Sequence, residues 1–209
     1  MGRITGVWAR AGALGLALAV SSPAPGAVAP RRGPTESRLA GKLLVAAPGM
    51  NDPRFAHTVI YVVQHDANGA MGLIVNQSFK EVPVASVLDQ LGLEHEAVTG
   101  SLRIHYGGPV GPGNVFILHT TDYRGRGTKV TGEGVALTAS PDVLRAIGSG
   151  KGPRRALLIV GYSGWGPGQL ERELQVGGWV VVSSDAALVF DDDYATKWER
   201  ALARREFEL

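Results

Sequence analysis

The chain has no cysteine among its 209 residues, which excludes disulfide bonds, thiolate metal ligands and a cysteine nucleophile. Charged residues, at 19%, and aromatic residues, at 7%, are also few. Hydrophobic residues supply 44% of the sequence, so the composition is that of a globular protein and not of a disordered one. The length fits one domain with a core of ordinary size.

A surplus of positive charge is missing from most of the chain. Residues 1–38 hold five arginines and one glutamate, whereas residues 39–209 hold 16 Lys and Arg against 18 Asp and Glu. The formal charges of the two parts are therefore +4 and −2. Since binding to a phosphate backbone depends on clustered positive charge, this distribution argues against direct contact with nucleic acid.

The N-terminal apolar run, at residues 11–20, is too short to span a membrane, which takes about 20 residues. It follows Arg3 and Arg10 and precedes the small residues Ala27-Val28-Ala29. This layout predicts a signal peptide over residues 1–29, and hence a periplasmic or secreted protein. A reading frame that starts too far upstream would explain the same residues. We expect residues 30–38 to be a disordered linker and residues 39–209 to form the domain.

Predicted strands and helices interleave irregularly in residues 39–209. Apolar and β-branched runs predict strands at 42–46, 58–64, 70–76, 102–106, 115–119, 154–160, 179–182 and 187–190. Helical spacing and capping residues predict helices at 83–91, 140–149 and 169–176, and a closing helix from 191 to 202. Residues 122–134 are polar and rich in glycine, which indicates a surface loop. The fold class is therefore α+β, a single compact domain with a mixed, largely antiparallel sheet flanked by helices.

The stretch from Gly161 to Leu174 is the most distinctive part of the sequence. Glycines at 161, 164, 166 and 168 predict a turn between a buried strand and a helix. Ser163 lies where a hydrolase nucleophile would, but the elbow pattern Gly-x-Ser-x-Gly has Trp165 in its closing position. A serine that satisfies backbone groups in the turn is the favoured interpretation.

Other sequence features give little support for a phosphate or metal site. Residues 148–152, Gly-Ser-Gly-Lys-Gly, resemble half of a P-loop but follow a predicted helix and lack a Ser or Thr after the lysine. The five histidines, at 57, 65, 95, 105 and 119, include no pair with the spacing of metal ligands. We therefore predict no metal and no cofactor, although the helix N-terminus near Gly168 offers free N–H groups to an anion.

Several motifs in order resemble the YqgE/AlgH family of bacterial proteins, over about Leu39 to the C-terminus. They are Gly41 to Ala46 with Pro48 and Phe55, His65-x-x-x-Gly69-Ala70-Met71-Gly72-x-x-x-Asn76, Gly107-Gly108-Pro109-Val110, and Gly161 to Glu171 with Trp179. The resemblance implies a compact α+β domain in the cytoplasm, usually without an N-terminal extension. It also implies a regulatory role connected with alginate production and transcription, and it brings no catalytic residues.

We therefore expect a noncatalytic regulatory protein, not an enzyme, that binds an unknown protein or small molecule. The predicted binding residues are Gly107, Gly108, Ser163, Gly164, Trp165, Gly168 and Gln169. Two alternatives stay open, a small-molecule hydrolase that uses Ser163 with a histidine from elsewhere, and a DNA-binding regulator. If Gly108 or Gly164 has a positive φ, alanine at that position should destabilise the fold by about 1 kcal/mol or more.

Overall fold

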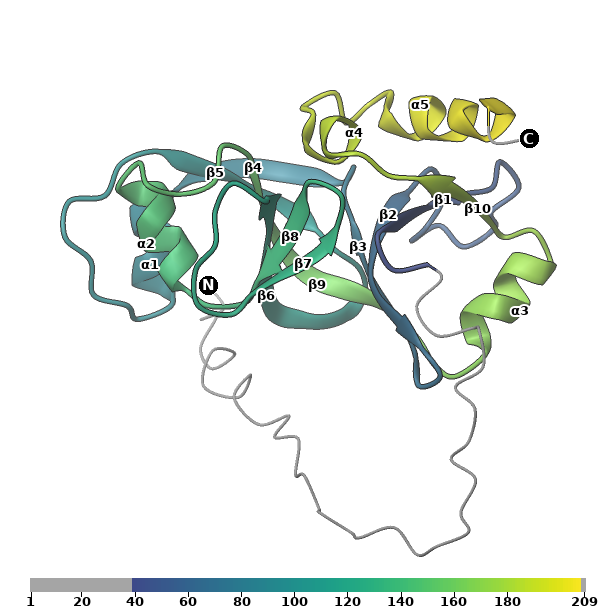
Figure 1. Ribbon diagram of the computed structural model, residues 1–209, viewed down its shortest axis with the longest axis horizontal. Helices are drawn as coiled ribbons and strands as arrows, with labels where there is room; N and C mark the ends of the chain where they lie inside the picture. Colours follow the sequence, from purple (N-terminus) through teal and green to yellow (C-terminus); the bar gives the residue numbers. More distant parts are fainter. Residues whose placement is uncertain (1–38, 208–209) are drawn as a thin grey trace, which may run out of the picture.

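A curled ten-stranded sheet organises residues 39–207, the part of the chain that the computed structural model describes (Figure 1). The strands are β1 (Lys42–Ala46), β2 (Val59–Asp66), β3 (Gly69–Ile74), β4 (Ser78–Pro83), β5 (Ser101–Tyr106), β6 (Val110–Thr120), β7 (Thr128–Gly132), β8 (Val135–Thr138), β9 (Ala156–Trp165) and β10 (Trp179–Ser183). The helices are α1 (Val84–Gln90), α2 (Asp142–Gly148), α3 (Gln169–Gln175), α4 (Ala186–Phe190), α5 (Lys197–Ala203) and the short 3₁₀ helix η1 (Arg204–Phe207).

The long strand β9 lies at the centre of the sheet, in the order β10-β1-β2-β3-β9-β6-β8-β7. Its first half also pairs with β5, in parallel, and β5 pairs with β4. Its second half pairs with β3, from Gly72 opposite Ser163 to Ala70 opposite Trp165. All other strand pairs in the described range are antiparallel, so the predicted fold class, an α+β domain with a mixed, largely antiparallel sheet, is confirmed.

Three apolar clusters hold the helices against the sheet. The main cluster joins residues of β1, β2, β3, β6, β8 and β9 with α4 and α5, a second packs α3 beside β2 and β10, and a third covers α1 and α2. Figure 1 shows α1 and α2 together at one end of the sheet, α3 at the other end, and α4 and α5 along one side. The run Val59–Val63 is buried throughout, as predicted for a strand covered on both faces.

The predicted turn at 161–168 is wrong in its first half, because β9 continues to Trp165. Residues Ser163 to Trp165 pair with β3, and only residues 166–168 turn before α3 begins at Gln169. Gly161 does have a positive φ of 72°, but the strand absorbs it without ending. Gly161 thus lets the Gly108 backbone approach β9 closely, since an added Cβ would lie 2.5 Å from the Gly108 carbonyl oxygen, and a pattern of glycines alone does not distinguish this from a turn.

Two further predictions are wrong. Residues 122–134 contain the strand β7, which pairs with β8, and both strands were missed because β7 is polar and β8, although apolar, has only four residues. Residues 187–190 belong to the helix α4, where Asp185 accepts a hydrogen bond from the Leu188 backbone N–H at 2.7 Å. Three consecutive buried side chains, Leu188 to Phe190, imitate a buried strand because the main core covers this short helix.

The closing helix also begins later than predicted. Residues 191–196 form an irregular segment before α5 starts at Lys197, so Tyr194 lies outside the helix. Strand β4 was not predicted at all. The expected signal peptide at 1–29 and the expected linker at 30–38 lie outside the described residues. Within those described, no helix combines the length and apolar character that a membrane span requires.

Candidate functional site

The seven predicted binding residues divide into a buried and an exposed group. Gly107, Gly108, Ser163 and Trp165 are buried, whereas Gly164, Gly168 and Gln169 are exposed. They gather along the second half of β9 and the start of α3, so the structure brings the two glycine motifs together. Binding by these residues stays a prediction.

Gly107 and Gly108 lie at the fork where β9 exchanges one neighbour, β5, for another, β3. The Gly107 N–H donates to the Val160 carbonyl at 2.8 Å, and its carbonyl accepts from the Ile74 N–H at 3.1 Å. The Ser163 hydroxyl donates to the same carbonyl at 3.1 Å. A Cβ on Gly108 would lie 2.5 Å from the Ser163 nitrogen, so only glycine fits. Ser163 itself is fully buried, as a fold-supporting serine would be.

Trp165 belongs to a polar network that fixes α3 on the sheet. Its indole N–H and that of Trp179 both donate to one Glu173 carboxylate oxygen, at 2.8 and 2.7 Å. Gln169 donates to the other oxygen at 2.9 Å and accepts from the Gly166 N–H at 3.1 Å. Gln169 and Glu173 therefore face back toward Trp165.

A second contact between α3 and the sheet joins His65 and Glu171. The His65 Nε2 lies 2.8 Å from a Glu171 carboxylate oxygen, and its Nδ1 is buried without a partner among the described residues. The pKa of Glu171 is lowered, first by a hydrogen bond from the Glu171 backbone N–H and then by one from the His65 ring. The Glu171 carboxylate is therefore ionised at neutral pH and accepts a hydrogen bond from the Nε2–H of His65.

The cavity best furnished for ligand chemistry lies elsewhere, between β5, the start of β9 and the segment that follows α4. It has a volume of about 360 Å³. Its wall carries cationic, anionic and aromatic side chains, among them Glu81, Arg103, His105, Arg155, Asp192 and Tyr194. We call it the Tyr194 cleft.

His105 lines the Tyr194 cleft, and its side chain has no solvent-exposed surface. Its Nδ1 lies 3.0 Å from the Arg103 backbone carbonyl, which can only accept, so Nδ1 carries a proton. Burial lowers the pKa of His105 to about 4, and the ring is neutral at pH 7. The Nε2 is then a lone-pair acceptor, and no group in the described part of the chain donates to it.

Two arginines and an aromatic ring line the cleft together with this histidine. The Tyr194 ring centre lies 5.2 Å from that of His105 and 5.9 Å from the Arg103 Cζ. Arg155 is committed to the protein, because it donates to the Phe190 carbonyl at 2.5 Å and to Asp192 at 2.8 Å. Burial, and then the hydrogen bond to Asp192, raise the pKa of Tyr194 to about 12, so its hydroxyl keeps its proton.

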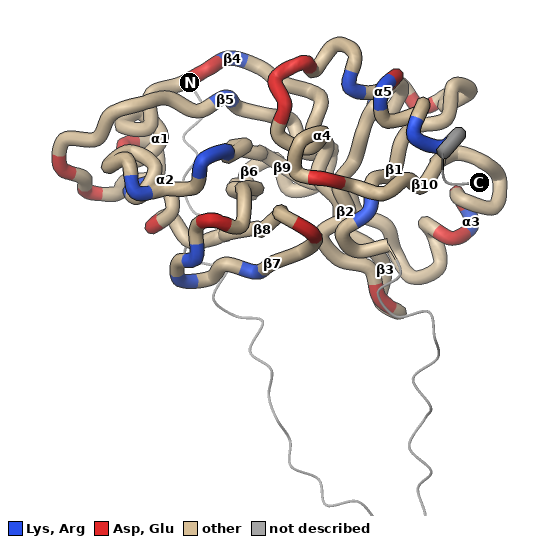
Figure 2. The backbone as a smooth tube through the Cα atoms, turned by 45° about the horizontal axis from the view of Figure 1, so that its top comes forward, with Lys and Arg blue, Asp and Glu red and all other residues tan. Residues whose placement is uncertain are grey.

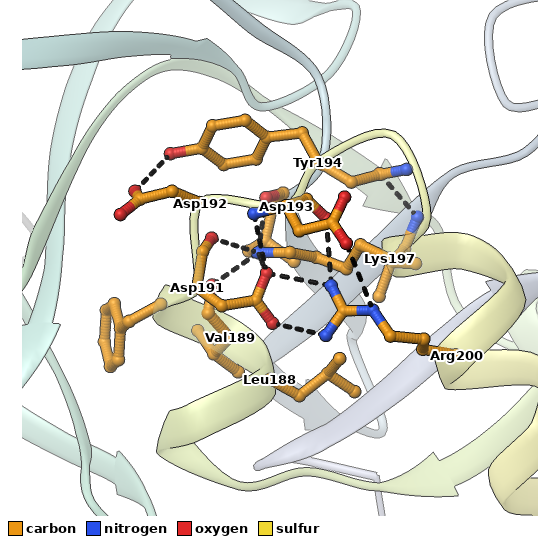
Figure 3. Close-up of polar contacts among 12 residues, drawn as sticks. Leu188, Val189, Asp191, Asp192, Asp193, Tyr194, Lys197 and Arg200 are labelled. Carbon is orange, nitrogen blue, oxygen red and sulfur yellow. Dashed lines mark hydrogen bonds and ion pairs between the residues drawn. The ribbon is translucent and has the colours of Figure 1, made fainter.

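The segment that carries Tyr194 is anchored by a buried lysine (Figure 3). The Lys197 Nζ donates to the Val189 and Asp191 carbonyls, both at 3.0 Å, and lies 3.7 Å from an Asp191 carboxylate oxygen. Arg200 binds both oxygens of that carboxylate, at 2.8 and 2.9 Å. Although burial alone would raise it, these two cations lower the pKa of the Asp191 carboxyl. Residues 191–194 are thereby held over the cleft.

Sequence reasoning missed this cleft, although one pattern in the sequence points to it. The alternation in Leu102-Arg103-Ile104-His105 places Arg103 and His105 on one face of β5, opposite the apolar pair. The partner segment at 190–194 is distant in sequence and was predicted partly as a strand and partly as a helix. In residues 39–207, no group of three or more His, Asp and Glu side chains has the arrangement of a metal site.

Comparison with known proteins gives consistent matches over most of the chain. A family model described as AlgH-like matches residues 43–209. A UPF0301 protein of Rhodospirillum rubrum is 45% identical over 169 residues, which are 81% of this chain and 88% of that protein. A UPF0301 protein of Caulobacter vibrioides is 46% identical, over 79% of this chain and 86% of its own length.

Two solved structures have a similar fold. The solution structure of the AlgH protein from Pseudomonas aeruginosa has a TM-score of 0.66 and 35% identity, over 88% of this chain and 92% of that one. A crystal structure of a protein from Corynebacterium diphtheriae has a TM-score of 0.62, over 79% of this chain and 86% of that one. At 22% identity, the latter is similar in fold alone.

Proposed function

The chain belongs to the AlgH-like family, which confirms the resemblance in its motifs, and on that premise we propose that it is a noncatalytic regulatory protein that acts by binding. The regulatory part of this proposal follows the role that the family resemblance implies. The binding part follows from the Tyr194 cleft, which we propose as the site of a small-molecule ligand.

One observation carries the proposal, the unpartnered Nε2 of His105, a buried residue in the wall of the Tyr194 cleft. A buried polar atom without a hydrogen bond costs about 1–3 kcal/mol, and folded proteins keep few of them. A ligand that donates to this nitrogen would recover that cost, and since the nitrogen has no exposed surface, the Tyr194 ring that packs on His105 would shift to admit it. The cationic Arg103 and the Tyr194 ring stand beside it to orient the ligand.

The two alternative functions have less support. A hydrolase would need a base that takes the proton of the Ser163 hydroxyl, but this hydroxyl donates to the Gly107 backbone carbonyl instead. Direct binding to DNA would need a basic surface. Figure 2 instead shows acidic and basic residues interspersed along the described chain.

A partner protein is a further part of the proposal. Gly164, Gly168 and Gln169 are the exposed members of the predicted binding set, at the end of β9 and the start of α3. We propose this surface as the contact for a partner, separate from the Tyr194 cleft.

A thermal-shift screen of chemically diverse small molecules tests the ligand site. We expect some compounds to stabilise the full-length protein, and we expect His105→Gln to abolish their effect. Arg145→Gln is the matched control, because Arg145 lies in a surface ion pair on α2, outside the Tyr194 cleft. Compounds that stabilise the His105 variant as well as the wild type would place the ligand elsewhere and contradict the proposal.

A further inference from the structure

We infer that the Tyr194 cleft selects a small oxyanion that carries its own hydroxyl group, such as a hydroxycarboxylate or a phosphate monoester. This inference deepens the proposed function and rests on it. It depends on Arg103 and His105, which lie two residues apart on β5 and both face the Tyr194 ring. Arg103 needs a hydrogen-bond acceptor, whereas the Nε2 of His105 needs a donor.

The anionic end of the ligand is assigned to Arg103. Its guanidinium presents five N–H donors, and its ion pair with Glu81 is 3.7 Å long, which exceeds hydrogen-bonding distance. The side chain is 41% exposed, so a ligand can reach it. An oxyanion with two oxygens matches the planar fork of an arginine better than a single acceptor does.

The hydroxyl is assigned to the Nε2 of His105. Because Nδ1 donates to the Arg103 carbonyl, the lone pair of Nε2 needs a donor and repels a bare anionic oxygen. A plain carboxylate satisfies only the arginine, and a neutral alcohol satisfies only the histidine. A hydroxycarboxylate or a monohydrogen phosphate satisfies both.

The other wall residues limit the size and the charge of the ligand. Glu81 and Asp192 lie in the same wall and repel additional negative charge. The cavity of about 360 Å³ has room for a small organic acid. Arg103 and His105 both lie within 6 Å of the Tyr194 ring centre, so that a ligand of a few heavy atoms can bridge them.

Calorimetric titration of the full-length protein with matched small ligands tests this selection. Glycolate carries a carboxylate and a hydroxyl, whereas acetate lacks the hydroxyl and ethylene glycol lacks the carboxylate. We expect glycolate to bind at least about tenfold more tightly than either, the factor that corresponds to one charge-assisted hydrogen bond. Inorganic phosphate is titrated in parallel, and tighter binding than glycolate would favour the phosphate class over the hydroxycarboxylate class.

Two variants assign the contacts. We expect Arg103→Gln to weaken glycolate binding at least about tenfold. We expect His105→Leu to bind glycolate and acetate equally. Arg145→Gln, with a side chain that is 40% exposed in wild type, is the matched control and is expected to bind like wild type. If the His105 variant does not fold, the response of the His105 ring nitrogens to glycolate in wild-type NMR spectra replaces it.

Equal binding of glycolate and acetate by the wild type would overturn the inference. If either ligand then perturbs the His105 and Tyr194 resonances, the cleft is still a ligand site and the proposed function stands. If none of the four compounds perturbs these resonances, the inference also fails, while the thermal-shift screen decides the proposed function independently.

Discussion

At the scale of single residues, burial holds His105 and His119 in their neutral forms. Burial lowers the pKa of His105 from 6.5 to about 4 and also lowers the pKa of His119. As the pH falls below 6.5, the unfolded chain takes up protons that the folded chain does not yet bind. Since the unfolded state then gains protons first, stability decreases with decreasing pH.

We predict that the free energy of unfolding falls between pH 6.5 and pH 4, with His105 contributing about 3 kcal/mol at most. Urea denaturation at a series of pH values measures the slope. His105→Gln should retain only the part of the slope due to His119 and other groups. An unchanged slope in that variant would show that His105 titrates normally in the folded protein.

Glu173 is a second residue whose effect follows from its contacts. It accepts from the indole N–H groups of Trp165 and Trp179 and from Gln169. We predict that Glu173→Ala lowers the free energy of unfolding by about 2 kcal/mol or more, because both buried indoles lose their acceptor. Glu173→Gln keeps one carbonyl oxygen and should cost less. Gln175→Ala, at an exposed position of α3, is the control, and chemical denaturation followed by tryptophan fluorescence is the measurement.

At the scale of secondary-structure elements, the fork of the sheet depends on glycine at 108. Gly108 has a φ of 143°, and an added Cβ would lie 2.4 Å from the Tyr162 backbone carbon. Gly164 does not have a positive φ, and its Cβ would meet the Tyr162 ring at 3.1 Å and the Val110 side chain at 3.8 Å. Glycine at position 108 and glycine at position 164 are therefore explained by different contacts.

A series of alanine substitutions separates these reasons. Gly150 has a φ of 72° and no atom within 4 Å of an added Cβ, so Gly150→Ala measures the backbone cost alone, about 1 kcal/mol. We predict that Gly108→Ala costs clearly more than this, because a backbone clash is added. Gly164→Ala should cost least, since the Tyr162 ring can shift. Equal denaturation midpoints for the three variants would contradict this account of the fork.

Elements with a strong local pattern could be predicted from the sequence, and elements defined by tertiary contacts could not. The run Val59–Val63 is apolar throughout, and the helix at 142–148 begins after a serine and a proline that favour a helix start. By contrast, α4 is an apolar pentapeptide, and its helical state depends on its packing in the main apolar cluster. The second half of β9 was predicted as a turn because its pairing with β3 involves residues about 90 positions away.

The candidate site was less predictable than the fold. Ser163, Trp165 and Gln169 were singled out by spacing, and their contacts to Gly107, Glu173 and Gly166 show that they lie where strands and α3 meet. The Tyr194 cleft needs β5 to lie against the segment after α4, which is about 90 residues further along the chain. No local pattern in a single sequence contains that contact.

At the scale of the whole molecule, the C-terminal segment closes one side of the curled sheet. Leu188, Val189, Phe190 and Ala201 complete the main core. The Trp198 indole N–H donates to the Ala46 carbonyl at 2.8 Å. The fully buried ammonium of Lys197 donates to the carbonyl of Val75, just after β3, and to the carbonyl of Val189 in α4. The closure of the fold is therefore coupled to the protonation of one lysine.

This coupling predicts a rise in stability at alkaline pH. Burial lowers the pKa of Lys197 from 10.5 to about 8, so the folded protein releases this proton before the unfolded chain does. The unfolded state then binds more protons, and the free energy of unfolding should increase by about 2 kcal/mol between pH 8 and roughly pH 9.5, before tyrosines of the unfolded chain titrate near pH 10. Lys197→Met should lack this rise, whereas Lys151→Met, at an exposed position, should keep it.

The slope of the free energy of unfolding against pH is the informative quantity. At neutral pH, Lys197→Met loses hydrogen bonds and also loses the cost of a buried charge, and these two effects have opposite signs. A wild-type protein whose stability is flat or falls over this range would show that Lys197 keeps its proton and that Asp191 compensates its burial fully.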